Sequence, residues 1–532
     1  MDPSDDTAVG ASPPALDGRT AAAGAAEPTV PPRYRRTVVT NYLYAASLIA
    51  VAVGVTPVLV RTLGKTEFGI WILVGSLALY LELLEFGFGG ATIKKIAQLD
   101  AVGSRKELRQ ATATSFWILA IPGLIALVAG IAISVFFSSI FDIPPELETA
   151  ALVVCLLISF DLAISIPSDT FGGVLIGLQR YDLLNTTLLV VVLTQAAGWV
   201  IVLALGGGLI ELAIVTVVVA LLGQLSRFIL ARRLLGGPLL SPRLVQRRLV
   251  RPLAGTSVWF SLSEIATVVS VRIDPVVVGI VVGVPEAAVY AVGQKLALAC
   301  TQLVNPLTDG FFPLSSELDA RGDRARLRGA ILTGTRISLA LAIPIALTVA
   351  ILADPAIEAW VGGGYEEAGI VVVLLVANAA LAMLTGVGIR MLMGTGSFRY
   401  PSLALAAEAA ANLGLSIGLG LKYGIVGVAV GSLLSTALVQ VVLAMPYIAR
   451  TFELPLVGWI ASLLRAHLVP GVATGLLGWA LLTVGIDGLG PVVGAAAAMM
   501  VTYLGLLWIT GLDGGERGAL IKLARSRRAS HA

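Results

Sequence analysis

Charge is scarce in this chain of 532 residues. Asp, Glu, Lys and Arg together make up 13% of it, whereas soluble proteins carry about 25%. Hydrophobic residues make up 57%, and the mean hydropathy is +0.92. The remaining charges cluster between apolar stretches of roughly 20 residues, the length that a helix needs to cross the hydrocarbon core of a bilayer. The composition therefore excludes a string of soluble domains and predicts one membrane-embedded bundle of helices.

Cysteine and histidine are nearly absent. Cys155 and Cys300 each lie inside an apolar stretch, which excludes a disulfide framework and a Cys-x-x-Cys metal pair. His467 and His531 are the only histidines, which argues against zinc sites and histidine-based catalysis. We expect no metal centre, and we interpret both cysteines as small buried apolar side chains.

Features of nucleic-acid and nucleotide binding are missing as well. The formal net charge is only +3 and no basic run is interleaved with aromatic residues, so a nucleic-acid partner is not expected. Gly64-Lys65-Thr66 resembles the end of a phosphate-binding loop, but that loop needs a glycine where Leu59 stands. No other segment predicts a nucleotide-binding domain, and we expect that ATP does not drive this chain directly.

About fourteen apolar stretches are long enough to span a bilayer, and they predict an all-α integral membrane fold. No cleavable signal peptide is recognised at the N-terminus, so the first spanning helix is expected to direct the chain to the membrane. The predicted spans cover residues 38–60, 69–91, 114–137, 150–176, 183–206, 209–231, 254–283, 286–313, 329–352, 367–389, 401–420, 424–447, 466–486 and 490–511.

The loops between these stretches alternate in charge. Lys and Arg concentrate in every second loop, whereas the other loops hold only Arg61, Lys65 and Lys422. The latter loops carry acidic residues instead, such as Glu146 and Asp354. Because Lys and Arg accumulate on the cytoplasmic side of a membrane, this alternation supports the helix count and predicts that both termini are cytoplasmic.

An internal repeat links the second and the eighth predicted helices. Residues 63–71 match residues 282–290, with a Gly-x-x-Glu pattern and an aromatic residue at the same offsets. Copies that lie six helices apart run in the same direction. They predict two six-helix halves related by an axis along the membrane normal, with a central cavity between the halves.

The repeat and the composition divide the chain. The first residues, rich in Ala, Pro, Gly and Asp, are expected to be disordered, and the basic C-terminal tail is expected to lie on anionic lipid. The predicted parts are a cytoplasmic tail at 1–32, an N-terminal half at 33–235, a cytoplasmic linker at 236–253, a C-terminal half at 254–450, two additional transmembrane helices at 451–512 and a basic cytoplasmic tail at 513–532.

Several charged residues fall inside the apolar stretches, where a charge costs at least about 2.5–3.5 kcal/mol. The seventh predicted helix carries Glu264, Arg272 and Asp274, and the eighth carries Lys295. Arg272 and Asp274 are two residues apart, so on a helix they point about 200° away from each other. Each of them therefore needs a partner elsewhere or water.

Other acids lie inside the N-terminal half. Asp161 is on the fourth predicted helix and Glu85 is on the second. For each intramembrane acid, two interpretations stay open. One is an internal ion pair or polar contact that fixes helix packing, and the other is a part in handling a substrate or an ion.

Three short segments resemble a known family. Leu84-Glu85-Phe86-Gly87 ends the second helix, Arg272-Ile273-Asp274 lies in the seventh, and Gln179-Arg180-Tyr181-Asp182 follows the fourth. They resemble oligosaccharide flippases (O-antigen flippase-like) of the polysaccharide-biosynthesis family, which belongs to the multidrug/oligosaccharidyl-lipid/polysaccharide exporter superfamily. Pro275, and Glu85 where Asp is more usual, depart from the family's commonest form.

The resemblance implies a transporter of the inner (plasma) membrane rather than an enzyme. It implies alternating access that moves a polyprenyl-diphosphate-linked oligosaccharide from the cytoplasmic to the outer leaflet, for cell-surface polysaccharide export. Membrane lipids and other polysaccharide assembly proteins are the further partners expected. A multidrug exporter and a lipid II flippase share the architecture and remain alternatives. Short loops argue against a membrane glycosyltransferase or polymerase.

Arg272 and Lys295 are the basic side chains furthest from the predicted cytoplasmic surface. A diphosphate in a low-dielectric cavity needs cationic partners, so we expect both residues to line the cavity and bind it. Intramembrane acids are candidates for a proton or sodium ion whose gradient drives the transporter. No other cofactor is expected. The ion-coupling or cavity candidates are Asp274, Glu264, Asp161 and Glu85.

Overall fold

The computed structural model describes residues 32–511 except 86–87 and 255–257, together with Arg517. The side chains of residues 32–35, 38, 251–261, 264 and 271 are not part of the description. The disorder predicted for the N-terminal tail, the lipid contact predicted for the basic tail and the predicted role of Glu264 therefore concern residues or side chains outside the described part.

Every described element is a helix or a turn, and no strand occurs among the described residues. The first half contains α1 (Pro32–Glu82), a 3-10 turn (Leu83–Glu85), α2 (Phe88–Val102), α3 (Arg105–Phe141), α4 (Pro145–Gly177), α5 (Tyr181–Ala204) and α6 (Leu209–Leu235). The linker adds a 3-10 turn (Pro242–Leu244) and α7 (Arg247–Ala254). The remainder contains α8 (Val258–Val281), α9 (Val284–Asp309), α10 (Phe311–Ala320), α11 (Arg324–Ile351), α12 (Ala353–Val361), α13 (Glu367–Gly394), α14 (Arg399–Thr436), a π-helix (Ala437–Ala444), α15 (Met445–Thr451), α16 (Leu456–Val484), α17 (Leu489–Leu506) and a second π-helix (Leu507–Gly511).

The helices account for the predicted membrane spans. Within the described residues, 11 helical segments are long and apolar enough to cross a membrane. Two of them each hold two predicted spans, separated by a kink at Gly64 (φ 72°) or at Gly424 (φ 62°). A positive φ of this size favours glycine, because a Cβ would clash with the backbone there. Together with α8, which carries three charged residues, these segments confirm the fourteen-helix fold.

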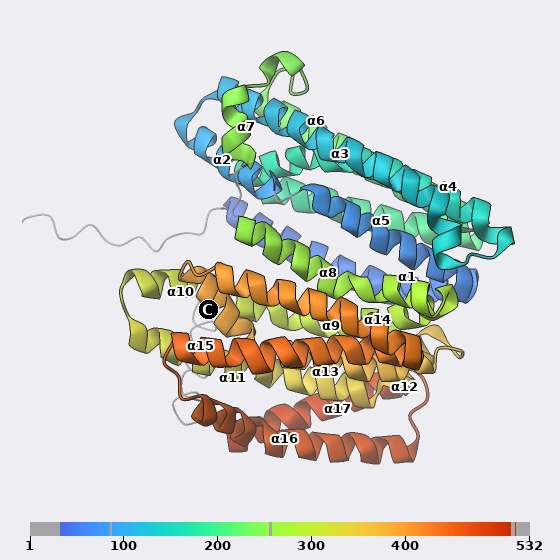
Figure 1. The fold of residues 1–532 in the computed structure, drawn as a ribbon, viewed down its shortest axis with the longest axis vertical. Helices are drawn as coiled ribbons and strands as arrows, with labels where there is room; N and C mark the ends of the chain where they lie inside the picture. Colours follow the sequence, from blue (N-terminus) through green and yellow to red (C-terminus); the bar gives the residue numbers. More distant parts are fainter. Residues whose placement is uncertain (1–31, 86–87, 255–257, 512–516, 518–532) are drawn as a thin grey trace, which may run out of the picture.

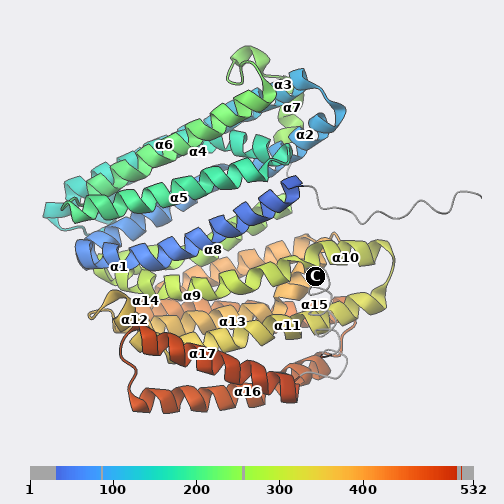
Figure 2. The same cartoon turned by 180° about the vertical axis from the view of Figure 1, so that it is seen from behind.

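The helices form two bundles with a seam between them (Figures 1 and 2). The helices α2–α6 lie on one side, and α9–α15 lie on the other, with α16 and α17 outermost against α11. The seam is formed by α1, which packs on both α5 and α9, and by α8, which packs on α14. The predicted domain boundaries and the predicted symmetry axis remain predictions.

The second predicted span is shorter than the sequence indicated. The helix ends at Glu82, and a separate helix, α2, begins at Phe88. The stretch between them contains Gly87, and Gly89 and Gly90 follow. Glycine weakens a helix because it loses more backbone entropy on ordering. The segment that follows the second predicted span, including Lys94 and Lys95, is helical and lies at one end of the bundle as part of α2 (Figure 1).

Candidate functional site

The two halves are joined at the end of the bundle that holds α12. Arg61 on α1 donates hydrogen bonds to the carbonyls of Trp360 and Val361, each at 3.3 Å. The Trp360 indole donates back to the carbonyl of Val53 at 2.7 Å. One buried apolar cluster continues through both halves here, from Phe68 to Tyr290. The helix α12 is therefore tied to α1.

The two copies of the predicted repeat touch at this end. Gly69 lies so close to the backbone of Val284 that a Cβ at position 69 would collide with the Val284 carbonyl. Lys65 lies 5.4 Å from the centre of the Tyr365 ring, across the same boundary. The close contact leaves no opening between Gly69 and Val284.

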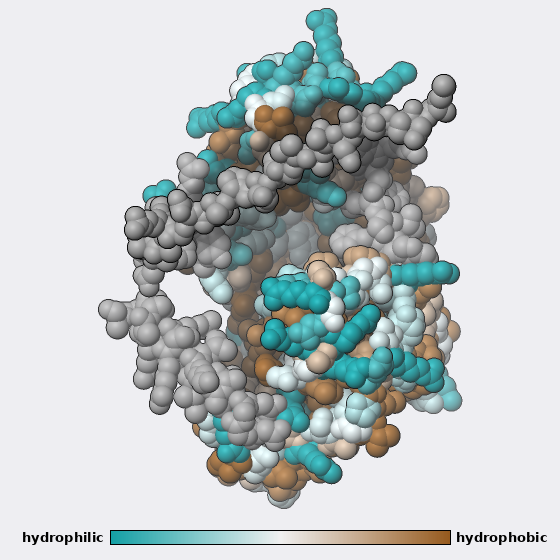
Figure 3. Space-filling model, turned by 90° about the vertical axis from the view of Figure 1, so that its left-hand side faces the viewer, coloured by the Kyte–Doolittle hydropathy of each residue, from teal (hydrophilic) through white to brown (hydrophobic). Residues whose placement is uncertain are grey.

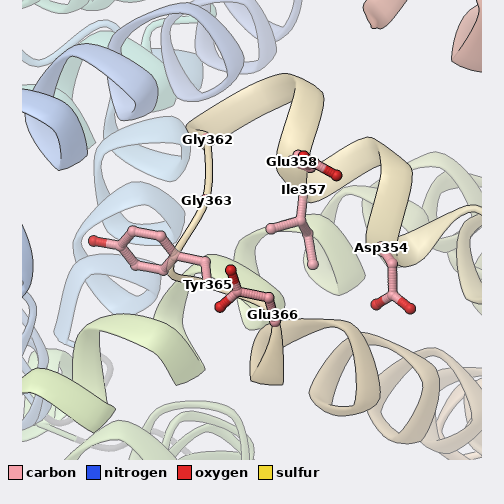
Figure 4. A pocket seen from close by; sticks show the side chains of 7 residues that line it. All are labelled: Asp354, Ile357, Glu358, Gly362, Gly363, Tyr365 and Glu366. Carbon is pink, nitrogen blue, oxygen red and sulfur yellow. The ribbon is translucent and has the colours of Figure 1, made fainter. Parts of the chain in front are cut away.

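A small cavity of about 330 Å³ lies beside the loop between α12 and α13 (Figure 4). The backbone N–H of Gly364 donates to the Glu366 carboxylate at 2.7 Å, which lowers the pKa of Glu366. The side chains of Asp354 and Glu366 point in different directions (Figure 4), and no acidic group suited to a metal ion occurs among the described residues. The lining residues are Asp354, Ile357, Glu358, Gly362, Gly363, Tyr365 and Glu366.

The opposite end, which holds α2, α7 and α10, is hollowed between the two halves (Figure 3). Along α1, most residues from 41 to 54 are exposed, whereas Val55, Leu59 and Val60 are buried. The structure is therefore closed at the α12 end and open at the α10 end. The orientation predicted from loop charge makes the open end cytoplasmic.

Arg272 and Lys295 are brought together near the seam. Both side chains are partly exposed, and their charges are close enough to repel each other. Lys295 donates a hydrogen bond to Thr56 on α1 at 3.1 Å and lies 5.2 Å from the centre of the Phe68 ring. The second contact is a cation–π interaction. This lysine of the second half therefore contacts the first half directly.

Among the described residues, neither of these two cations, Arg272 and Lys295, forms an ion pair. Glu82 and Tyr80 on α1 lie in electrostatic range of Arg272, without an ion pair. Two neighbouring cations without a paired carboxylate form a site suited to an anion with more than one charge.

Asp274 has a different environment from Arg272, as the helical spacing predicted. Its carboxylate is 2% exposed. It accepts hydrogen bonds from Tyr290 at 2.7 Å, Ser432 at 2.8 Å and Asn412 at 3.3 Å. All three donors are neutral and belong to the second half. Arg272 therefore faces groups of the first half, while Asp274 lies inside the second.

More oxygen atoms lie around this carboxylate. Ser416 donates to the Asn412 side-chain oxygen at 2.7 Å, and the Ser432 hydroxyl is 3.1 Å from that same oxygen. Both serine hydroxyls also approach the carbonyl of Val428, at 3.2 and 3.3 Å. Sequence reasoning missed Asn412, Ser416 and Ser432, because a neutral polar residue in an apolar helix gives no sign of its partner. The set of oxygens suits a hard cation or a proton.

The N-terminal candidates Asp161 and Glu85 form a looser acidic group. Asp161 and Glu85 both lie in electrostatic range of Asp169. Asp169 pairs with Arg227 on α6 at 3.1 Å. One oxygen of Asp161 is buried without a hydrogen-bond partner among the described residues. Asp161 and Glu85 therefore share Asp169 and Glu82 as charged neighbours.

Comparison with known proteins gives the context of this fold. None of the curated proteins compared with the chain matches it. An inward-facing multidrug resistance MATE family transporter of the MOP superfamily is similar, with a TM-score of 0.68 and 14% identity over 78% of this chain and 98% of that one. The lipid II flippase MurJ in an inward closed conformation is also similar, with a TM-score of 0.66 and 14% identity over 88% of this chain and 98% of that one.

A third similar structure is a MOP superfamily transporter from Pyrococcus furiosus, described as having a binding pocket of reverse polarity. Its TM-score is 0.54, and it shares 12% identity over 79% of this chain and 95% of that one. These likenesses show that the chain has the same helical fold as these proteins. The profile of the family described as polysaccharide biosynthesis protein matches residues 40–319, more than half of the chain, and the chain therefore belongs to that family.

Proposed function

We propose that this protein is a flippase for lipid-linked oligosaccharides. It moves a polyprenyl-diphosphate-linked glycan from the cytoplasmic to the outer leaflet, for export of a cell-surface polysaccharide. The single observation that carries the proposal is the pair of cations Arg272 and Lys295, which lie together near the seam without a paired carboxylate in the described residues. Membership of the polysaccharide biosynthesis family supports the same substrate class.

The chemistry of a diphosphate matches this pair. Arg272 offers a planar fork for two phosphate oxygens, and Lys295 acts as a point charge on a flexible stem. The two cations repel each other when no substrate is bound. A doubly charged anion between them attracts both, and this attraction offsets the repulsion. The prenyl tail remains in the lipid while the head group crosses the membrane.

The seam contacts suggest how the two access states are linked. Opening the α12 end requires the bonds of Arg61 to α12 and the bond between Lys295 and Thr56 to break. A diphosphate that binds Lys295 competes with Thr56 for the ammonium group. Substrate binding therefore weakens a contact that holds the closed end together, and alternating access follows from that competition.

We further propose that Asp274 binds the coupling proton or sodium ion. A buried carboxylate that is surrounded by neutral groups is stabilised by a proton or a cation, and its neighbours supply the additional oxygens. Asp274 is on α8, and its donors come from α9 and from both arms of α14. The first arm is the part of α14 before the kink at Gly424, and the second arm is the part after it. Movement of α8 against α14 changes the ligand set, which gives the two access states different ion affinities.

The test is the amount of lipid-linked oligosaccharide in each leaflet of a depleted strain that is complemented in turn by each variant. Accumulation on the cytoplasmic leaflet should be relieved by the wild-type chain but not by the Arg272→Ala, Lys295→Ala double variant. Lys422→Ala is the matched control, because this lysine is exposed at the other end of the bundle. A normal distribution in the depleted strain, or full rescue by the double variant, contradicts the proposal.

The acidic group of the first half favours one alternative function. A multidrug exporter needs negative charge for cationic drugs, and the group around Asp161, Glu82 and Glu85 supplies it. Unchanged leaflet distribution with increased drug sensitivity in a deletion strain would support this alternative. Loss of viability with accumulation of lipid II would instead point to a lipid II flippase.

A further inference from the structure

A second carboxyl group is buried in the C-terminal half. Glu408, on the first arm of α14, is 8% exposed. Thr436 donates to one of its oxygens at 2.7 Å, and the amide nitrogen of Gln440 donates to the other at 2.5 Å. The amide oxygen of Gln440 in turn accepts a hydrogen bond from Thr385 on α13 at 2.5 Å. Both oxygens of Glu408 are therefore occupied by neutral donors.

The position of Glu408 relates it to the Asp274 site. It precedes Asn412 by four residues on the first arm of α14, and Thr436 follows Ser432 by four residues on the second arm. Four residues are about one helical turn, or roughly 5–6 Å along the axis. Glu408 thus lies in the next polar layer between the same two arms.

That layer lies on the side of the hollow. The first arm of α14 begins at Arg399, next to the end of α13, and Ser316 of α10 donates a hydrogen bond to the carbonyl of Gly394 on α13. The arm therefore starts at the open α10 end and reaches Glu408 before Asn412. Along this arm, Glu408 lies between the α10 end and Asn412, a donor to Asp274.

The backbone is irregular at the same place. The π-helix at Ala437–Ala444 begins directly after Thr436 and carries Gln440. Such π-helical segments are rare, and they frequently occur at functional sites. This irregularity falls in the same polar layer and places Gln440 beside Glu408.

Within the described part of the chain, the ion pairs of the neighbouring helices do not include Glu408. On α13, Arg390 pairs with Asp309 of α9 at 2.9 Å. The π-helix carries no titratable residue. On α8, Asp274 has its own three donors, Arg272 lies in electrostatic range of groups of the first half, and the side chain of Glu264 is outside the described part.

We propose that Glu408 is a second proton-binding site, which exchanges a proton with water of the hollow ahead of Asp274. An ionised carboxylate that lacks a cationic partner is costly inside a membrane, and a proton removes that cost. A metal ion fits less well here than at Asp274, because the described contacts of the Glu408 carboxyl add one hydroxyl oxygen, that of Thr436, whereas those of Asp274 add the hydroxyls of Tyr290 and Ser432. In the exchange, the O–H bond of Glu408 forms as hydronium gives up a proton, and it breaks as water accepts one.

This inference rests on the proposed ion coupling, and its test can be separated from that proposal. Infrared difference spectra of the purified full chain in lipid nanodiscs, recorded between low and high pH, report carboxyl groups that gain a proton. We expect a band of a buried protonated carboxyl that is lost in Glu408→Gln and retained in Glu408→Asp. It should also be retained in Asp274→Asn and in the exposed control Glu358→Gln. Elution as a single species on size exclusion checks the fold of each variant.

The outcomes are distinct. If Glu408→Gln loses none of the carboxyl bands that the wild-type chain shows, the proton site at Glu408 is overturned, whether or not transport depends on a gradient. Loss of the band in Glu408→Gln supports the site even if transport in liposomes ignores both gradients, a result that overturns only the proposed ion coupling. If Glu408→Gln does not fold, the Gln440→Leu variant replaces it. A band that is unchanged in position in Gln440→Leu overturns the site.

Discussion

The acidic side chains of the two halves are held in different ways. In the N-terminal half, Glu82, Glu85 and Asp161 lie in electrostatic range of Asp169, and the cation Arg227 pairs with Asp169. The side chain of Asp169 is 43% exposed. This group combines several carboxylates with one fixed counter-charge.

The C-terminal half contains two carboxylates, Asp274 and Glu408, that belong to none of the ion pairs of the described residues. Asp274 and Glu408 are both buried, and within the described residues their hydrogen-bond donors are hydroxyl and amide groups. A carboxylate beside a guanidinium is stabilised as an anion, whereas a buried carboxylate among neutral donors gains most from a proton or a mobile cation. The comparison supports the proposal that an ion binds in the second half, whereas the acids of the first half have a paired cation beside them.

The largest expected effect is on transport, and it should differ between a buried acid of the second half and one of the first. Asp274→Asn keeps the shape of the side chain but removes the charge that binds the ion, so gradient-driven flipping in liposomes should fall by about 5- to 150-fold, the usual range of a coupling between sites. Asp161→Asn is the matched change in the first half and should have a smaller effect. An equal or larger loss of flipping with Asp161→Asn would contradict the proposed difference between the acids of the two halves.

The stability of the Asp274 network is the next test. Asn412→Leu removes a donor to Asp274 and an acceptor for Ser416, and leaving such buried groups without partners costs about 1–3 kcal/mol. Thermal unfolding in detergent measures this cost. Asn378→Leu is the control, because the oxygen of Asn378 already lacks a partner among the described residues. Equal destabilisation by the two variants would argue against the network.

The ion pair of the first half should contribute less. A double-mutant cycle with Arg227→Gln and Asp169→Asn, read by thermal unfolding, should give a coupling of about 1 kcal/mol or less, because the carboxylate is partly exposed. A coupling several times larger would mean that this pair is as strongly desolvated as the acids of the second half.

The smallest effect concerns the contact between the halves. Arg61→Gln weakens two hydrogen bonds to α12 that are 3.3 Å long, each contributing about 0.5 kcal/mol. Spin labels on α1 and α12 should show a modest increase in the population that is open at this end. Arg450→Gln, at the other end of the bundle, should leave the distribution of distances between the two labels unchanged. A shift of equal size in both variants would show that the Arg61 bonds do not hold the end closed.

Much of this fold could be predicted from the sequence, because its signals are local. Apolar length and alternating loop charge indicated the helices, and the 3.6-residue period separated Arg272 from Asp274. The end of α1 at Glu82 was missed because the apolar pattern continues through the 3-10 turn at Leu83–Glu85.

The candidate site could be predicted only in part, because the signals in the sequence are local. The charged members Arg272, Lys295 and Asp274 are conspicuous in an apolar helix, since lipid penalises charge. Asn412 and Ser432 lie 138 and 158 residues from Asp274 along the chain, and their neutral side chains are tolerated in many membrane helices. Nothing local to the sequence marks them as partners.

The sequence by itself determined that this protein is a helical membrane protein, which family it resembles and which charges are buried within it. The tertiary structure alone decided which end of the bundle is closed, which cation contacts the other half and which neutral groups surround each buried acid. The reason is physical: membrane insertion depends on the summed hydropathy of each segment, whereas hydrogen-bond partners depend on packing between helices that are distant in the chain.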